Sequence, residues 1–118
     1  MIIGNQHLST LFSQAKVSPR LRLNYDLRNT PEDNSQRMLN ALEPGTVVPI
    51  HRYRNTSETV VIVRGSLIER FYDEEGNIIE EVLMVPGGEN SVVQVEKGRW
   101  HSTRNMRCLS LTSGCCIH

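Results

Sequence analysis

Short β-forming stretches separated by turn residues fill the chain after Gly45. Residues 59–63 are continuously β-branched, which is typical of a strand buried on both faces. Residues 73–77 have the composition of a hairpin turn, in which Gly76 can take a positive φ. This regular spacing predicts a mostly β domain built as an antiparallel sandwich or barrel. The expected strands are residues 47–50, 59–63, 67–72, 78–85, 91–95, 100–104 and 108–112.

One short helix is expected before these strands, beginning near Pro31. Thr30 is a helix-capping residue, and proline is common at the first helical position. Met38, Leu39 and Leu42 then recur at helical spacing, and Pro44 forces the chain out of the helix. We therefore divide the chain into an N-terminal arm (1–29), a β-barrel domain with a leading helix (30–114) and a C-terminal tail (115–118). Arginines and leucines alternate in the arm, which predicts a strand or extended segment there.

Charge and length exclude several classes of protein. The 118 residues include 13 Lys and Arg and 13 Asp and Glu, so the formal net charge is zero. A protein that binds nucleic acid through phosphate contacts normally has a basic excess, so we expect no nucleic-acid partner. No apolar run approaches the roughly 20 residues that a membrane span needs, so we expect no membrane insertion.

The cysteines favour a reducing compartment. There are three of them, Cys108, Cys115 and Cys116, and an odd number argues against a disulfide framework. The N-terminus also has neither the basic nor the apolar region of a secretory signal, so we expect a cytoplasmic protein. Cys115 and Cys116 could form a metal-binding tail with His118, although a frayed terminus is the simpler interpretation.

Two histidines and a glutamate are the candidates for chemistry. His51 ends one expected strand, and Tyr53, two residues later, should share its face. Glu58 opens the next strand and can reach that face if the two strands pair. His101 belongs to a distant strand, but a closed barrel brings distant strands to a common interior. Two imidazoles and a carboxylate are typical of a divalent transition-metal site with free coordination positions, although each residue alone is more often structural.

Glycine spacing around these residues resembles the two motifs of the cupin superfamily. Five residues separate Gly45 from His51, four separate Tyr53 from Glu58, and six separate Glu58 from Gly65. In the second motif, Gly98 precedes His101 by three positions, and Asn105 follows four positions after His101. The resemblance implies a jelly-roll-like double-stranded antiparallel β-barrel. It also implies a metal held by His51, Glu58 and His101.

The stretches 36–46, 58–65 and 98–101 are similar to the WbuC-like cupin-fold metalloproteins. That resemblance covers roughly residues 20–105, and such proteins are often encoded among bacterial polysaccharide genes. It implies one divalent transition metal (iron, zinc, nickel or manganese). It also implies a sugar-related small polar ligand in polysaccharide metabolism. Cupins are often dimers, so a homodimer is a further expectation, and the arm could add a strand to a partner sheet.

The sequence departs from the cupin pattern most importantly at Tyr53, where the motif has a second histidine. Glu96 and Asn90 replace a proline and a glycine of the second motif, which affects only loop shape. Tyr53 could ligate a ferric ion as a phenolate. It could instead remain neutral beside a site of two histidines and one carboxylate, acting as a proton donor. It could also mark a site that has lost its affinity for metal.

Three functional hypotheses remain open at this stage, and the residues do not decide whether the protein is an enzyme. The first is a metal-dependent protein that acts on or binds a small polar metabolite, with Tyr53 as the candidate catalytic residue. The second is a small-ligand-binding module with a degenerate metal site and no turnover. The third is a metal-free sugar isomerase or epimerase that uses His51 and Tyr53 as an acid–base couple.

Overall fold

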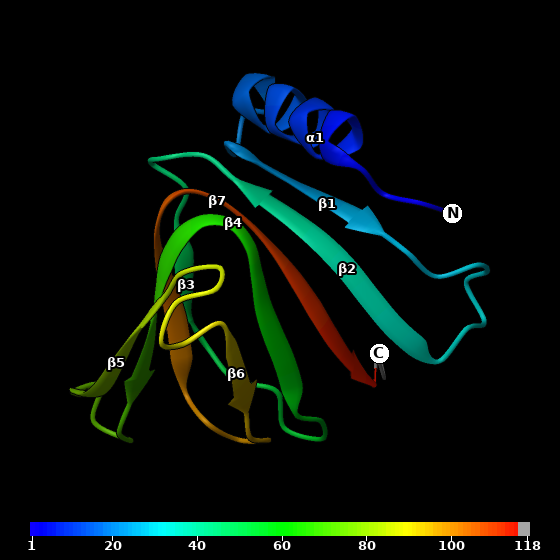
Figure 1. Cartoon of the computed structure of the whole chain (residues 1–118). Helices are drawn as coiled ribbons and strands as arrows, with labels where there is room; N and C mark the ends of the chain where they lie inside the picture. The colour runs from blue at the N-terminus through cyan, green and yellow to red at the C-terminus, as the bar shows by residue number, and fades with distance from the viewer. Residues whose placement is uncertain (116–118) are drawn as a thin grey trace.

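Within residues 1–115, the chain forms one antiparallel sheet of seven strands that curves into a barrel, with one helix against its outer face (Figure 1). The computed structural model describes residues 1–115, so Cys116 and His118 of the expected tail lie outside the described residues. The strand order is β1-β2-β7-β4-β5, with β3 pairing with β7 and β6 pairing with β4. The elements are α1 (Asn5–Val17), β1 (Arg22–Asp26), β2 (Ser35–Leu42), β3 (Val48–His51), β4 (Glu58–Tyr72), β5 (Ile78–Met84), β6 (Val92–Val95) and β7 (His101–Cys115). The predicted mostly β domain with an N-terminal helix is confirmed.

Two long, bent strands replace four of the short strands expected from the sequence. β4 and β7 each contain 15 residues, and both arch from one side of the barrel to the other (Figure 1). β4 bends at Gly65, which has a φ of +79°, and the register with β7 shifts on both sides of it. A Cβ at this position would overlap the carbonyl oxygen of Arg107. Glycine therefore lets the two strands stay paired through the bend, where a turn was expected.

The helix expected near Pro31 is wrong, because that segment contains a turn followed by strand β2. The backbone N–H of Asp33 donates to the carbonyl of Thr30, and the Asp33 carboxylate then accepts from the N–H of Ser35. β2 pairs with β1 on one side and with β7 on the other. Its two faces are both covered: Leu39 packs towards α1, whereas Leu42 belongs to the barrel core. A strand that is apolar on both faces produces the same spacing as a helix.

The true helix, α1, lies in the segment expected to be an arm. Leu8, Leu11, Phe12 and Ala15 follow a helical period, and the first, second and fourth of them are buried against β1, β2 and β7. That period was a usable signal. The strand expected in the arm is confirmed as β1, which pairs with β2 of the same chain.

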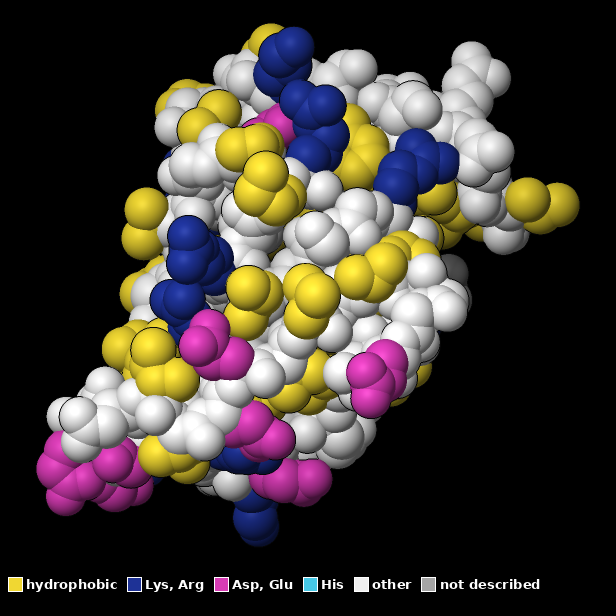
Figure 2. Space-filling model, turned by 60° about the vertical axis from the view of Figure 1, so that its left-hand side comes forward, with side chains coloured by type: hydrophobic (Ala, Val, Ile, Leu, Met, Phe, Trp, Pro, Cys, Tyr) yellow, Lys and Arg dark blue, Asp and Glu magenta, His cyan; other side chains and the backbone are white. Residues whose placement is uncertain are grey.

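The described residues form two apolar clusters on opposite faces of the sheet. One lies inside the barrel and includes Phe71, Met84 and Val95, and the other lies between α1 and the sheet. The surface carries apolar side chains interspersed with charged ones on the face shown in Figure 2. Within residues 1–115, no helix has the length and apolarity that crossing a membrane requires.

Candidate functional site

The two candidate histidines face each other across paired strands at one end of the barrel. His51 ends β3, His101 begins β7, and the two residues are direct partners in the antiparallel pairing. Their ring centroids are 4.1 Å apart. The strand pairing differs from the expected one, in which the strand of Glu58 paired with the strand of His51. Instead, β3 pairs with β7, and β4 pairs with β5, β6 and β7. β4 and β7 both bend over the barrel (Figure 1), so Glu58, the first residue of β4, comes close to His101 although it pairs with Gly114 near the other end of β7.

Backbone carbonyls set the orientation of both imidazoles. Nδ1 of His51 lies 2.8 Å from the carbonyl oxygen of Pro49, and Nδ1 of His101 lies 3.0 Å from that of Arg99. A carbonyl oxygen only accepts hydrogen bonds, so each Nδ1 carries the hydrogen in the neutral ring. Each Nε2 is then left with a lone pair. This is the arrangement that metal-binding histidines commonly show, with the second ring nitrogen tied to a carbonyl.

His101 contains an unusual buried atom. The residue is 1% exposed, and its Nε2 has no hydrogen-bond partner within the described residues. Burial is the main reason why its pKa is lowered, with the nearby His51 and Arg99 acting in the same direction and the Arg99 carbonyl opposing them. The ring is therefore held in its neutral form. Because buried polar atoms are nearly always hydrogen-bonded, this lone pair is a place where a ligand atom can bind.

Glu58 and Tyr53 complete the group. Oε1 of Glu58 lies 3.9 Å from Nε2 of His101, which is too long for a hydrogen bond. Burial raises the pKa of Glu58, while His51 and a hydrogen bond from Tyr53 act against that rise. Tyr53 is 39% exposed, and its ring lies 5.5 Å from that of His51. The structure thus brings together all four residues that the sequence singled out.

The donor set fits a divalent transition metal by chemical type. Two imidazoles, whose Nδ1 atoms are held by backbone carbonyls, and one carboxylate are suitable ligands for iron, zinc, nickel or manganese. Within residues 1–115, however, no three His, Cys, Asp or Glu side chains stand close enough to form a ready-made metal cluster. The side chains of His51, Glu58 and His101 would therefore have to move closer together around an ion.

Sequence reasoning missed the inner part of the cavity. All four residues line a cavity of about 120 Å³ that continues into the barrel. Glu69 also lines it, is 2% exposed and accepts a hydrogen bond from Thr103. Burial, with a smaller contribution from the Glu58 charge, raises the pKa of Glu69 to about 8. The period-two pattern of Leu67, Glu69 and Phe71 was the available signal, because it places all three on the inner face.

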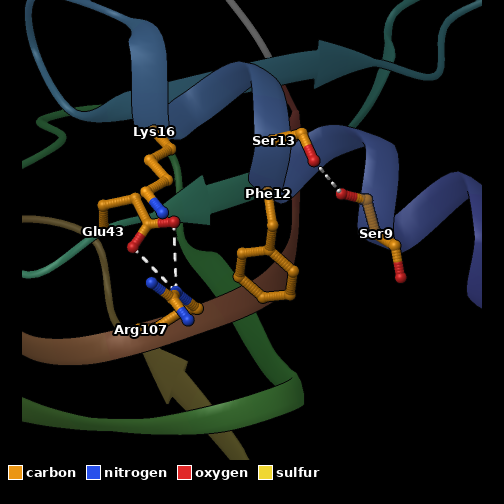
Figure 3. Close-up of a pocket in the computed structure, with 6 residues that line it drawn as sticks. All are labelled: Ser9, Phe12, Ser13, Lys16, Glu43 and Arg107. Atoms are coloured by element: carbon orange, nitrogen blue, oxygen red, sulfur yellow. Dashed lines mark hydrogen bonds and ion pairs between the residues drawn. The ribbon is translucent and has the colours of Figure 1, made fainter.

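A second, more open recess of about 260 Å³ lies between α1 and the sheet (Figure 3). Lys16 and Phe12 from α1 face Glu43 and Arg107 across it. Nε of Arg107 lies 2.8 Å and 3.1 Å from the two carboxylate oxygens of Glu43, which is itself buried. The Arg107 guanidinium is therefore already paired with a carboxylate, which makes this recess a weaker candidate for anion binding than one with an unpaired arginine.

Comparison with known proteins identifies the sequence family of this chain, and comparison with solved structures identifies its fold. A family model described as Domain of unknown function (DUF6016) matches residues 3–84. No protein of curated function matches the sequence significantly. Nothing in these comparisons supports the WbuC-like family specifically, so that resemblance stays a prediction.

Several solved structures share the fold at low sequence identity. CapF, a capsular polysaccharide assembling protein from Staphylococcus aureus, has a TM-score of 0.70 and 21% identity over 86% of this chain and 29% of its own. Oxalate oxidase in complex with the substrate analogue glycolate has a TM-score of 0.66 and 14% identity over 85% and 53%. A cupin superfamily protein from Desulfitobacterium hafniense has a TM-score of 0.61 and 18% identity over 82% and 78%. The chain therefore has the cupin fold, and it spans about half of oxalate oxidase and under a third of CapF.

Proposed function

The chain belongs to the family described as Domain of unknown function (DUF6016), and from this premise we propose a function argued from its barrel site. The protein binds a small polar metabolite in the cupin barrel, at one divalent transition metal ion held by His51, Glu58 and His101. Iron, zinc, nickel and manganese all suit this donor set.

The buried Nε2 of His101 is the observation that carries this proposal. It has no hydrogen-bond partner within the described residues, and it lies on the cavity that His51 and Glu58 also line. Carbonyl groups hold both Nδ1 atoms, so Nε2 is the ring nitrogen that each histidine would use to bind a metal ion. A metal ion would satisfy the lone pair of His101 and offset the burial that raises the pKa of Glu58.

A bound metal ion would act as a Lewis acid that polarises an oxygen atom of the ligand. The chain itself supplies proton handling at the mouth of the cavity. The hydroxyl of Tyr53 hydrogen-bonds to Glu58, and this tyrosine is the most exposed of the four residues. Tyr53 can therefore hold or release a proton beside the ligand, which makes it the proposed catalytic residue if the protein turns its ligand over.

A role in bacterial polysaccharide metabolism is part of the proposal. It is supported by the resemblance to WbuC-like proteins and by the similarity of fold to CapF, which is described as a capsular polysaccharide assembling protein. The ligand would then be sugar-related. A cytoplasmic location and a homodimer belong to the same proposal.

Metal analysis of the purified protein tests the metal site. We expect about one metal ion per chain after loading, and loss of most of it in His51→Ala and in His101→Ala. His7→Ala is the matched control, because His7 lies on α1 and contacts Tyr25 on the other face of the sheet. Substoichiometric metal that is the same in all four proteins would refute the metal site.

A metal-free binding module is the second candidate, favoured by two observations. Within residues 1–115 no ready-made metal cluster exists, and Tyr53, which replaces a histidine, is hydrogen-bonded to Glu58. This candidate predicts that ligands stabilise the protein equally with and without a chelator and that no product forms. Thermal unfolding with sugars, followed by mass spectrometry of the mixture, distinguishes it from the first candidate.

A further inference from the structure

The inner wall of the barrel cavity carries polar side chains that the proposed metal site does not use. They come from three neighbouring strands, β2, β4 and β7, and they are less exposed than Tyr53. Apolar side chains of the same strands lie among them. The polar residues are Asn40, Glu69, Thr103, Ser110 and Thr112, and the apolar ones include Leu42, Val60 and Leu67.

Two hydrogen-bonded pairs stand on different walls of this space. Thr103 of β7 donates to Oε2 of Glu69 on β4 at 3.3 Å. On the other pair of strands, Nδ2 of Asn40 on β2 donates to the hydroxyl of Thr112 on β7 at 3.1 Å. Each hydroxyl and each side-chain carbonyl or carboxyl group can make more than one hydrogen bond. The Asn40 Nδ2 and the Thr112 hydroxyl each also donate to the Met38 carbonyl at 3.5 Å, so the Thr112 oxygen keeps acceptor capacity only. The Thr103 oxygen likewise can still accept, so each pair can receive a hydrogen bond from a hydroxyl group in the cavity.

Charge and size restrict what can bind there. Among the described residues that line the cavity there is no lysine or arginine, so the cavity lacks the side chains that most often bind a phosphate or carboxylate. The whole cavity, including the part lined by the proposed metal ligands, has a volume of about 120 Å³, equivalent to roughly four water molecules at about 30 Å³ each, so this is the upper limit for a ligand inside it. A molecule of about that size with several hydroxyl groups and exposed C–H groups would match both the polar pairs and the apolar walls.

We infer that the inner cavity is a subsite for a small uncharged polyol, in which the pairs Glu69–Thr103 and Asn40–Thr112 each recognise one of its hydroxyl groups. This inference rests on the proposed function, because it places the ligand in the same barrel. It narrows the ligand class from sugar-related metabolites in general to neutral polyols or the neutral polyol end of a larger molecule. Glu69, Thr103 and Thr112 are then specificity-determining residues.

Binding of glycerol and erythritol, compared with glycolate and glycerol phosphate, tests the inference. We expect the two polyols to bind more tightly than the two anions in saturation-transfer NMR titrations made in the presence of a chelator. Thr103→Val and Thr112→Val keep the side-chain shape and remove one hydroxyl, so each should weaken polyol binding by about 2- to 10-fold. Thr59→Val is the matched control and should leave affinity unchanged, because the Thr59 hydroxyl on β4 donates to the side chain of Gln94 on β6 in an exposed pair and does not line the cavity.

The outcomes separate this inference from the metal proposal. Equal or tighter binding of the anions would overturn it, and so would unchanged polyol affinity in both valine variants while their thermal unfolding stays cooperative. Zinc titration of the same variants provides the second readout, because Thr103→Val and Thr112→Val should keep the zinc affinity that His101→Ala loses. Polyol binding without zinc binding would reject the metal site alone, and zinc binding without polyol binding would reject the subsite alone.

Discussion

Replacing the buried Glu69 by glutamine should make the stability of the protein much less dependent on pH. Burial raises the pKa of Glu69 from 4.5 to about 8, so the folded state holds this proton where the unfolded chain releases it. The contribution of Glu69 to the free energy of unfolding is therefore fully present below about pH 4.5 and is lost as the pH rises towards 8. Glutamine is neutral throughout, and its carbonyl can still accept the hydrogen bond that Thr103 donates.

The size of the effect follows from the pKa shift. Between the two pKa values, each pH unit lowers the free energy of unfolding by about 1.4 kcal/mol. From about pH 5 to about pH 7, the free energy of unfolding of the wild-type protein should fall by roughly 2 to 3 kcal/mol because of Glu69, and Glu69→Gln should not show this fall. The lowered pKa of His101 acts with the opposite sign, adding stability as the pH rises up to its ordinary value of 6.5. Comparison of variant and wild type at each pH removes that contribution.

Urea unfolding at several pH values measures the difference. The two proteins should have similar stability near pH 5, and Glu69→Gln should be clearly more stable near pH 7. Glu75→Gln is the matched control, because Glu75 lies exposed in the turn between β4 and β5 and should follow the wild type. Parallel curves for wild type and Glu69→Gln across this range would show that Glu69 is ionised in the folded protein and would refute the reasoning.

Three further changes test the fold by thermal or chemical denaturation. Gly65→Ala should cost more than about 3 kcal/mol, because the new Cβ would meet the backbone of β7. Gly76→Ala, at a similar positive φ with open space around it, should cost only about 1 kcal/mol. Arg107→Met should cost about 1 to 3 kcal/mol, since it leaves the buried Glu43 carboxylate without its ion pair; an unchanged melting temperature would contradict this. Cys108 should resist thiol reagents in the native protein, as judged by mass-spectrometric mapping, because burial raises its pKa to about 12.

Local patterns were sufficient for the β-rich class and for the members of the candidate site. The turn at 73–77 and the strand content after Gly45 follow from residue types that restrict the backbone locally. His51, Glu58 and His101 were found because glycine spacing around them resembles a known motif, and the structure brings them to one cavity. Whether they hold a metal ion stays a prediction.

The long strands and the placement of the helix depended on tertiary contacts. Residues 35–42 have helical spacing, yet they form β2, because α1 covers one face of the segment and the barrel core covers the other. No local signal could reveal that both faces would be buried. Similarly, Gly65 looks like a turn residue in the sequence, and only the close approach of β7 makes it a bend within a continuous strand.

Sequence alone determined which side chains are available for chemistry, because residue type sets what each can donate, accept or coordinate. Tertiary structure alone decided the pKa values and the hydrogen-bond partners of those side chains. Glu69 is an ordinary glutamate in the sequence, and its raised pKa exists because the bent β4 carries it into the barrel beside Glu58. Likewise, the free Nε2 of His101 results from burial by strands that are distant in the chain. Desolvation and charge proximity are properties of three-dimensional packing, so they cannot be read from the order of residues.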